Sequence, residues 1–339
     1  ERTPQEREEA LELALRQMNA NGLTGVHAAG IREEEWKLYK TFADEDRLTA
    51  RIYAMIEGTE EFFDSMAESG PVKNYGNGEN MLALRSVKIW TDGALGSRGA
   101  ALLQDYQDDP GNTGLLFYDQ QELTRMVGKG VSNGYQMNIH AIGDAANRQV
   151  LNAFENVLKE RGGKELRHRI EHAQVVHTDD IPRFKKLGII ASMQPAHATS
   201  DMNMAEERIG TDRMKGAYAW QKFLRQGTVI AGGSDFPVES VNPFEGLHAA
   251  VTRQDAEGRP PGGWYADEAM SREEALRSFT LDAAYAAHQE EILGTLEPGK
   301  WADFIIIDRD YFEIPAREIR EITVLETWLG GQPIHQLNK

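Results

Sequence analysis

Short apolar segments alternate with helix-forming segments along most of this chain of 339 residues, and this alternation constrains the fold more than any other feature. Each apolar segment has about the length of one β-strand. The predicted strands cover residues 23–28, 50–56, 84–91, 135–140, 168–172, 189–194 and 228–234. Strands that alternate with helices are typical of βαβ units and of a parallel sheet. The chain is therefore predicted to have an α/β fold.

The distribution of polar residues favours a closed (β/α)8 barrel of the TIM type over an open sheet. Polar side chains follow one predicted strand after another, whereas an open sheet gathers them at a single crevice. The chain supplies seven predicted strands and a barrel needs eight, so we expect the first strand to precede Glu1. Residues 1–290 are predicted to be a catalytic barrel domain that lacks this strand. The long loops at 92–118 and 195–213 are expected to carry functional residues.

After residue 290 the character of the sequence changes. A turn at 296–300 precedes an apolar strand at 302–308, and two further short strands follow at 322–329 and 333–334. These strands do not continue the alternation of strands and helices, and one or two hairpins rarely form a stable unit alone. Residues 291–339 are therefore predicted to be the C-terminal part of a small, partial β-sandwich domain.

Composition excludes several classes of partner. The formal net charge of −17 disfavours a nucleic acid or an anionic membrane surface, because the field of the protein repels phosphates. No run of roughly 18 apolar residues is present, so no membrane-spanning helix is expected. Without cysteine the chain has no disulfide and no thiolate ligand for zinc. A small molecule is the expected partner, and homodimerisation is left open.

The compartment is not fixed by these features. Glu1 stands where an initiating Met is expected, so a segment that carries a signal peptide could precede it. The cytoplasm is the favoured location, with a secreted or periplasmic location as the alternative.

Four predicted strands carry a metal-competent side chain at or near their carboxyl ends: Lys88, His140, His172 and Asp235. In a barrel these ends meet at one face, where active sites lie. Each residue has an ordinary alternative taken alone. Asp235 is equally suited to cap the next helix, and a single histidine at a strand end is usually a hydrogen-bonded polar residue. Their occurrence at four matching positions favours a shared metal site.

Lys88 is the least expected member of this set, because a buried ammonium is costly unless it is paired or chemically altered. Carbon dioxide can convert the amine to a carbamate, whose two oxygens can bridge two divalent ions. The alternative is that Lys88 pairs with Asp92, Glu171 or Asp235, or extends its amine towards solvent.

Five separated motifs resemble those of the amidohydrolase superfamily and, within it, amidohydrolase family 3, a group of metal-dependent amide hydrolases. The motifs span most of the chain in the family's order. They are VKIWTDGALGSR at 87–98, IHAIGD at 139–144, RIEHA at 169–173, GSD at 233–235 and GTLEPGKWAD at 294–303. The resemblance implies a distorted barrel with one or two zinc-like divalent ions, flanked by a small β-sandwich.

The resemblance also implies roles for individual residues. Lys88 would be a carboxylated bridging ligand, His140 and His172 would hold the second ion, and Asp235 would bind the first. Asp235 would also act as general base and then general acid, which passes a proton from water to the leaving nitrogen. A divalent ion would lower the pKa of water from 15.7 to about 7. The implied reaction is hydrolysis of a C–N bond in an amide, formamide or related non-peptide substrate.

The sequence departs from the family at one point. A His-x-His pair at the end of the first barrel strand normally supplies two ligands, and the 339 residues contain no such pair. We expect the pair to lie upstream of Glu1. The alternative is a non-catalytic binding or regulatory barrel that has lost one metal site, and a sugar or phosphotriester hydrolase on the same barrel is a third reading.

Three further residues are candidates for substrate binding. His197 follows the predicted strand at 189–194, and it is suited to hydrogen-bond the substrate or an oxyanion. Ser97 and Arg98 lie in the loop after the strand at 84–91, where they could meet a carbonyl or an anionic group. The ordinary alternatives are a loop histidine without a role and an exposed arginine in a glycine-flanked loop.

Overall fold

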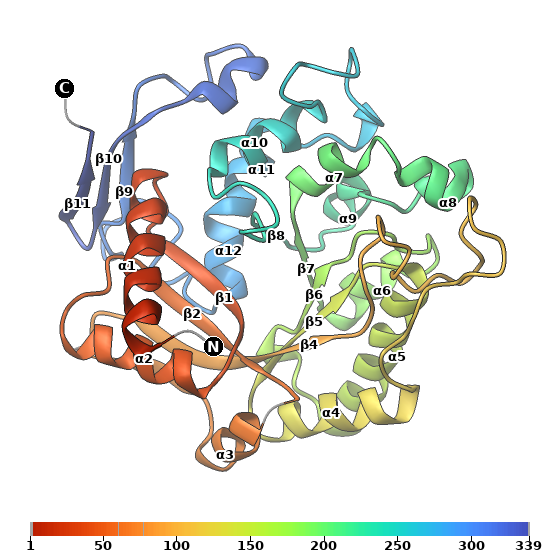
Figure 1. Ribbon diagram of the computed structural model, residues 1–339, viewed down its shortest axis with the longest axis horizontal. Helices are drawn as coiled ribbons and strands as arrows, with labels where there is room; N and C mark the ends of the chain where they lie inside the picture. Colours follow the sequence, from red (N-terminus) through yellow and green to blue (C-terminus); the bar gives the residue numbers. More distant parts are fainter. Residues whose placement is uncertain (1–2, 60, 77, 338–339) are drawn as a thin grey trace.

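The computed structural model describes residues 3–59, 61–76 and 78–337. Its main sheet has the strand order β1-β2-β4-β5-β6-β7-β8, in which each neighbouring pair is parallel. The sheet curls as in a barrel and helices cover its outer face (Figure 1). Within the described residues β1 and β8 are its edge strands. These strands are β1 Gly25–Ile31, β2 Arg51–Glu57, β4 Leu82–Trp90, β5 Gln136–Ala141, β6 Arg169–His172, β7 Ile190–Met193 and β8 Ile230–Gly232. The predicted α/β barrel-type fold is confirmed.

The central strands are buried on both faces, which explains why they read as continuous apolar runs rather than as alternating patterns. Every residue of β5, β6 and β7 is buried. The outward side chains of these strands pack under the helices, and the inward side chains fill the interior of the curl. Polar residues on the inward face are therefore enclosed together, as the buried ion pair of Arg169 and Glu171 shows.

The helices between the strands follow ordinary amphipathic rules. In α4, Leu123, Val127 and Val131 are buried at a spacing of four residues, and the Asp119 side chain caps the helix by accepting from Glu122 N at 2.8 Å. The helices are α1 Pro4–Ala20, α2 Glu33–Asp44, α3 Glu61–Ser69, α4 Gln120–Ser132, α5 Asp144–Arg161, α6 Ile181–Leu187, α7 Pro195–Asp201, α8 Ala205–Met214, α9 Trp220–Arg225, α10 Pro243–Thr252, α11 Arg272–Phe279 and α12 Leu281–Ala286.

Several local predictions need correction. The segment 195–213, predicted as a loop, contains α7 and most of α8. Polar composition concealed these short helices, although Pro195 begins α7 as proline often does. Thr280 separates α11 from α12. The short strand β3 Val72–Tyr75, which pairs antiparallel with β4, was not predicted.

The C-terminal strands form a separate antiparallel sheet of β9 Phe304–Ile307, β10 Val324–Leu329 and β11 Gln332–Gln336. This sheet lies beside α1 (Figure 1), and Thr327 Oγ1 donates to Asn19 O at 2.7 Å. A buried two-pronged ion pair joins Arg51 of β2 to Asp303, with nitrogen–oxygen distances of 2.7 and 2.9 Å. The expected second small β unit is thus present, and the division at residues 290 and 291 stays a prediction.

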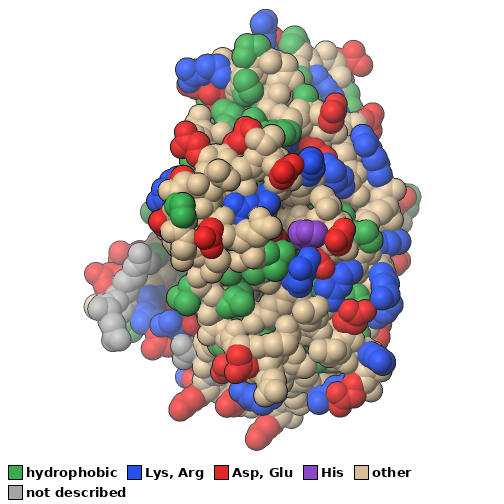
Figure 2. Space-filling view, turned by 90° about the vertical axis from the view of Figure 1, so that its right-hand side faces the viewer, with side chains coloured by type: hydrophobic (Ala, Val, Ile, Leu, Met, Phe, Trp, Pro, Cys, Tyr) green, Lys and Arg blue, Asp and Glu red, His purple; other side chains and the backbone are tan. Residues whose placement is uncertain are grey.

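The surface on the side of α5, α6 and α8 carries acidic and basic side chains in a mixed pattern (Figure 2). Hydrophobic side chains gather in a smaller group on the same face. None of the described helices has the length and apolar character needed to cross a bilayer.

Candidate active site

The sequence-predicted metal ligands lie where the parallel strands end. Lys88 is on β4, His140 is on β5, His172 is the last residue of β6, and Asp235 follows β8. The register pairs Lys88 with Asn138 and Trp90 with His140, so Lys88 and His140 share one face of the sheet. The imidazole rings of His140 and His172 lie 4.5 Å apart between centroids. The parallel register therefore brings His140 and His172 to the same edge of the sheet as Lys88, although they follow Lys88 by 52 and 84 positions in the sequence.

The orientation of His172 depends on the backbone. Arg169 Nη1 lies 2.8 Å from His27 Nδ1 of β1, a strand that is not a neighbour of β6, so Arg169 points into the interior of the curl. Glu171 pairs with Arg169, and strand alternation would then turn His172 outward. His172 has φ 75°, a left-handed conformation that costs about 1–3 kcal/mol in a non-glycine residue. This conformation ends the strand and accounts for the turn of the ring towards His140.

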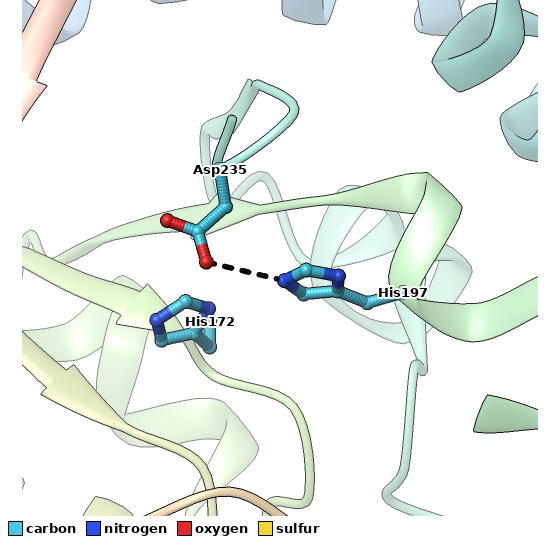
Figure 3. Close-up of side chains that lie close together, drawn as sticks. All are labelled: His172, His197 and Asp235. Atoms are coloured by element: carbon cyan, nitrogen blue, oxygen red, sulfur yellow. Dashed lines mark ion pairs between the residues drawn. The ribbon is translucent and has the colours of Figure 1, made fainter. Parts of the chain in front are cut away.

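His172, His197 and Asp235 converge closely enough to share one ion. Their candidate ligand atoms all lie within 4.8 Å of one another. Asp235 Oδ2 is 3.5 Å from His197 Nε2, and Figure 3 shows the His172 ring beneath the same carboxylate. Asp235 also has a left-handed backbone, with φ 58°. Sequence reasoning identified all three residues, but it assigned His197 to the substrate rather than to this cluster.

The electrostatic environment separates the two histidines of this cluster. Burial lowers the pKa of His172 well below its usual value, and the neighbouring His140 and Lys88 lower it further. Burial also lowers the pKa of His197, but Asp235 and Glu239 outweigh it and raise the pKa to about 9. Neutral imidazole is the form that binds metal ions, so His172 is already in the ligand form at neutral pH.

Lys88 is 4% exposed and lies inside the curl. Burial lowers the pKa of its amine, while the negative charges of Glu171 and Asp235 act in the opposite direction. Glu171 is itself engaged by Arg169, with Nε 2.8 Å from Oε1 and Nη2 2.9 Å from Oε2. The suggested pairing of Lys88 with Glu171 therefore competes with an arginine that already occupies this carboxylate.

Three imidazoles lie at the site, those of His140, His172 and His197. Each has one ring nitrogen turned towards an oxygen of a residue that is not a candidate ligand. His172 Nδ1 lies 2.8 Å from Gln194 Oε1, and Gln194 Nε2 donates to Ser192 O at 3.2 Å. Since an amide oxygen only accepts, His172 Nδ1 carries the hydrogen and Nε2 is free for a ligand. His197 Nδ1 lies 3.1 Å from Glu239 Oε1, and His140 Nε2 lies 3.3 Å from a carboxylate oxygen of Asp92. Such partners orient metal-binding histidines and raise their basicity.

The two other predicted substrate residues have partners within the protein. Arg98 donates to both oxygens of Asp108, at 3.2 and 2.8 Å, and Arg208 of α8 binds the same carboxylate. Ser97 Oγ donates to Ala94 O at 3.1 Å. These contacts tie the loop after β4 to α8, and a role of Ser97 and Arg98 towards substrate stays a prediction.

Sequence reasoning missed Glu239 and Gln194, and it considered Asp92 only as a partner for Lys88. Asp92 lies two residues after the end of β4, and Gln194 is the first residue after β7, so both have the strand-end signal that identified the ligands. Glu239 lies in the irregular segment after β8 and offers no local signal. Only the fold reveals that it contacts His197.

Comparison with known proteins gives consistent matches. The sequence profile of the amidohydrolase family matches residues 1–335. The putative amidohydrolase YtcJ of Bacillus subtilis (strain 168) is 31% identical over 337 residues, which cover 97% of this chain and 61% of that protein. The N-substituted formamide deformylase of Arthrobacter pascens is 29% identical, over 95% of this chain and 59% of that enzyme.

Among solved structures, an uncharacterized metal-dependent hydrolase from Pyrococcus horikoshii OT3 superposes with a TM-score of 0.82 at 29% identity. The match covers 93% of this chain and 62% of that one. The chain thus spans about three fifths of the length of these relatives, with 61%, 59% and 62% covered.

Proposed function

The chain belongs to the amidohydrolase family, and from this premise we propose that it is a metal-dependent hydrolase of the C–N bond in a small amide or formamide. The observation that carries the proposal is the convergence of His172, His197 and Asp235, with the His140 ring 4.5 Å from the His172 ring and Lys88 buried beside them. The choice of a C–N bond draws on the name of one relative, an N-substituted formamide deformylase.

The residues of the site suit a divalent ion. Lys88, His140, His172 and Asp235 would hold it, and imidazole and carboxylate donors without thiolates suit zinc among other ions. Two features support this fit. The His172 imidazole is neutral because of its burial, and its outer nitrogen is already engaged by Gln194. When bound, the ion would polarise the scissile carbonyl and lower the pKa of water.

Asp235 is the proposed general base and acid. Its side chain is 40% exposed, so it can meet both water and substrate, whereas the side chains of Asp92 and Glu171 are 0% and 8% exposed. Asp235 takes one proton from the attacking water as the new C–O bond forms. It returns that proton to the nitrogen as the C–N bond breaks, which gives a carboxylic acid and an amine.

His197 is proposed to bind the substrate. It lies on α7 rather than on a strand, and Glu239 engages its Nδ1 while Nε2 faces Asp235. A donor at this position is suited to the carbonyl oxygen of the substrate, where negative charge develops during attack.

Metal loading and substrate panels test this function directly. Protein loaded with Zn²⁺ should retain at least one ion per chain and hydrolyse N-substituted formamides or simple amides in preference to esters. Removal of the ion with a chelator should abolish turnover, and added Zn²⁺ should restore it. Less than one ion per chain would contradict the proposal. Zinc binding without turnover of any panel member would favour the non-catalytic binding barrel.

A subsidiary proposal is that Lys88 is carboxylated. The buried ammonium would first lose one proton to give the amine, and Nζ would then form a bond to the carbon of CO2 and release a second proton to solvent. The product is an anionic group with two oxygens. Carbon-13 NMR after exposure to labelled bicarbonate should show a carbamate signal that Lys88→Met removes. Lys215→Met is the matched control, because Lys215 is 68% exposed. An unmodified amine in the metal-loaded protein would refute carboxylation.

A further inference from the structure

Asp92 is a buried carboxylate to which the proposed chemistry assigns no role. It lies two residues after the end of β4, and its side chain is 0% exposed. Burial of a carboxylate is costly unless hydrogen bonds compensate it. Three backbone N–H groups do so here, those of Ala101, Ile142 and Gly143.

These hydrogen bonds leave one direction open. Asp92 Oδ2 accepts from Ala101 N at 2.9 Å and from Gly143 N at 2.8 Å. Oδ1 accepts from Ile142 N at 3.0 Å and lies 3.3 Å from Nε2 of His140. His140 Nε2 is buried and forms no hydrogen bond among the described residues, so its 3.3 Å approach to Asp92 Oδ1 is a contact between a carboxylate and an unpartnered ring nitrogen. Oδ1 accepts one described hydrogen bond and Oδ2 accepts two, so Oδ1 keeps an acceptor position on the side of the carboxylate that contacts the imidazole.

The backbone around Asp92 fixes this arrangement. Thr91 N and Thr91 Oγ1 both donate to the carbonyl oxygen of His140, at 3.2 and 2.5 Å. Gly143 allows the loop to approach α5, since a Cβ at this position would lie 1.9 Å from Ala101 O. Two consecutive residues after β4 thus hold the main chain and the ring of His140.

We propose that Asp92 is a positioning residue that holds the hydrogen of His140 at Nε2 and leaves Nδ1 as the ligand atom. A carboxylate only accepts, so a neutral imidazole that faces it carries the hydrogen at the facing nitrogen. The consequence for metal binding rests on the proposed function, in which His140 is a ligand. The predicted tautomer of His140 does not depend on the proposed function.

His172 provides a contrast within the same site. His172 Nδ1 donates to the neutral amide of Gln194, whereas His140 Nε2 faces the carboxylate of Asp92. Both arrangements free one nitrogen, but they free opposite ones, Nε2 of His172 and Nδ1 of His140. A carboxylate also raises the basicity of the imidazole more than an amide does.

The substitution Asp92→Asn should reverse the tautomer. The asparagine oxygen is required at the Oδ2 position, because both Ala101 N and Gly143 N donate there. The amide NH2 group then replaces Oδ1 and faces His140 Nε2. An NH2 group donates, so the hydrogen of His140 moves to Nδ1, and the proposed ligand atom is blocked.

A nitrogen-15 NMR experiment on the metal-free, imidazole-labelled protein tests this inference. The His140 ring should carry its hydrogen at Nε2 in the unaltered protein and at Nδ1 in Asp92→Asn. Zn²⁺ affinity, measured by chelator competition, should fall about 10- to 100-fold in Asp92→Asn. Asp144→Asn is the matched control, since Asp144 is also buried at the start of α5 and accepts from Leu103 N at 2.8 Å.

The control should leave both the tautomer and the Zn²⁺ affinity unchanged. A His140 ring with its hydrogen at Nδ1 in the unaltered protein would overturn the inference without any variant, so failure of a variant to fold does not protect it. Equal Zn²⁺ affinity of Asp92→Asn and the unaltered protein would also overturn it. If the unaltered protein does not bind Zn²⁺, the proposed function is contradicted. The position of the hydrogen on the His140 ring would still decide the role of Asp92.

Discussion

The two sides of the candidate site hold their carboxylates in different ways. On the side of β4 and β5, Asp92 is 0% exposed and is fixed by backbone amides. On the side of β7 and β8, Asp235 is 40% exposed and its ion-pair partner is the side chain of His197. The first carboxylate is set by the course of the main chain, whereas the second contacts a side chain and reaches solvent. This difference separates a group suited to orienting a ligand from a group suited to transferring a proton.

The largest expected effect comes from the exposed side. Asp235→Asn removes the proposed proton carrier, so turnover should fall about 10²- to 10⁴-fold. Steady-state kinetics on the substrate identified from the panel would measure it. Asp212→Asn is the control, because Asp212 is 96% exposed on α8 and its turnover should be unchanged. Full activity of Asp235→Asn would remove the distinction between the two sides.

Glu239 should give the next largest effect. Glu239→Ala removes the acceptor at 3.1 Å from His197 Nδ1, and turnover should fall about 10- to 100-fold as the ring loses its orientation. Glu239→Gln should recover part of this loss, because an amide oxygen still accepts. Zn²⁺ affinity should change little in either variant, in contrast to Asp92→Asn. A Glu239 variant with weaker Zn²⁺ affinity and an unchanged turnover number at saturating Zn²⁺ would contradict this division between the two sides.

Ser200 should give the smallest effect. Its Oγ donates to Glu239 Oε1 at 2.6 Å, so Ser200→Ala removes one hydrogen bond from the residue that orients His197. A net contribution of about 1 kcal/mol corresponds to about a fivefold loss of turnover. Thr199→Ala is the control, since Thr199 Oγ1 donates to the neighbouring carbonyl of Ala196. Equal kinetics for the two variants would show that Glu239 needs no support from Ser200.

Much of the fold followed from local pattern. The seven predicted strands correspond to β1, β2 and β4 to β8, with ends that differ by a few residues. Buried parallel strands have continuous apolar sequences, so they were visible without an alignment. Short helices such as α7 and α8 were not, because their composition is polar and their stability comes from tertiary contacts.

The candidate site was predictable only where a residue stands at a strand end. Lys88, His140, His172 and Asp235 each follow or interrupt an apolar strand, and the parallel topology brings such positions together. His172 shows the limit of this reasoning, because strand alternation alone would have turned it away from the site. Its position depends on φ 75°, which no sequence pattern indicates.

The sequence by itself determined the order of the seven parallel strands, the apolar core of the sheet and the residues at the strand ends, because these are set by local periodicity and side-chain chemistry. The tertiary structure alone decided which oxygen faces which imidazole nitrogen. Asp92 reaches His140 across 48 residues, and Glu239 reaches His197 across 42. Contacts of this kind depend on strand register, on loop path and on single backbone angles, so only the folded chain defines them.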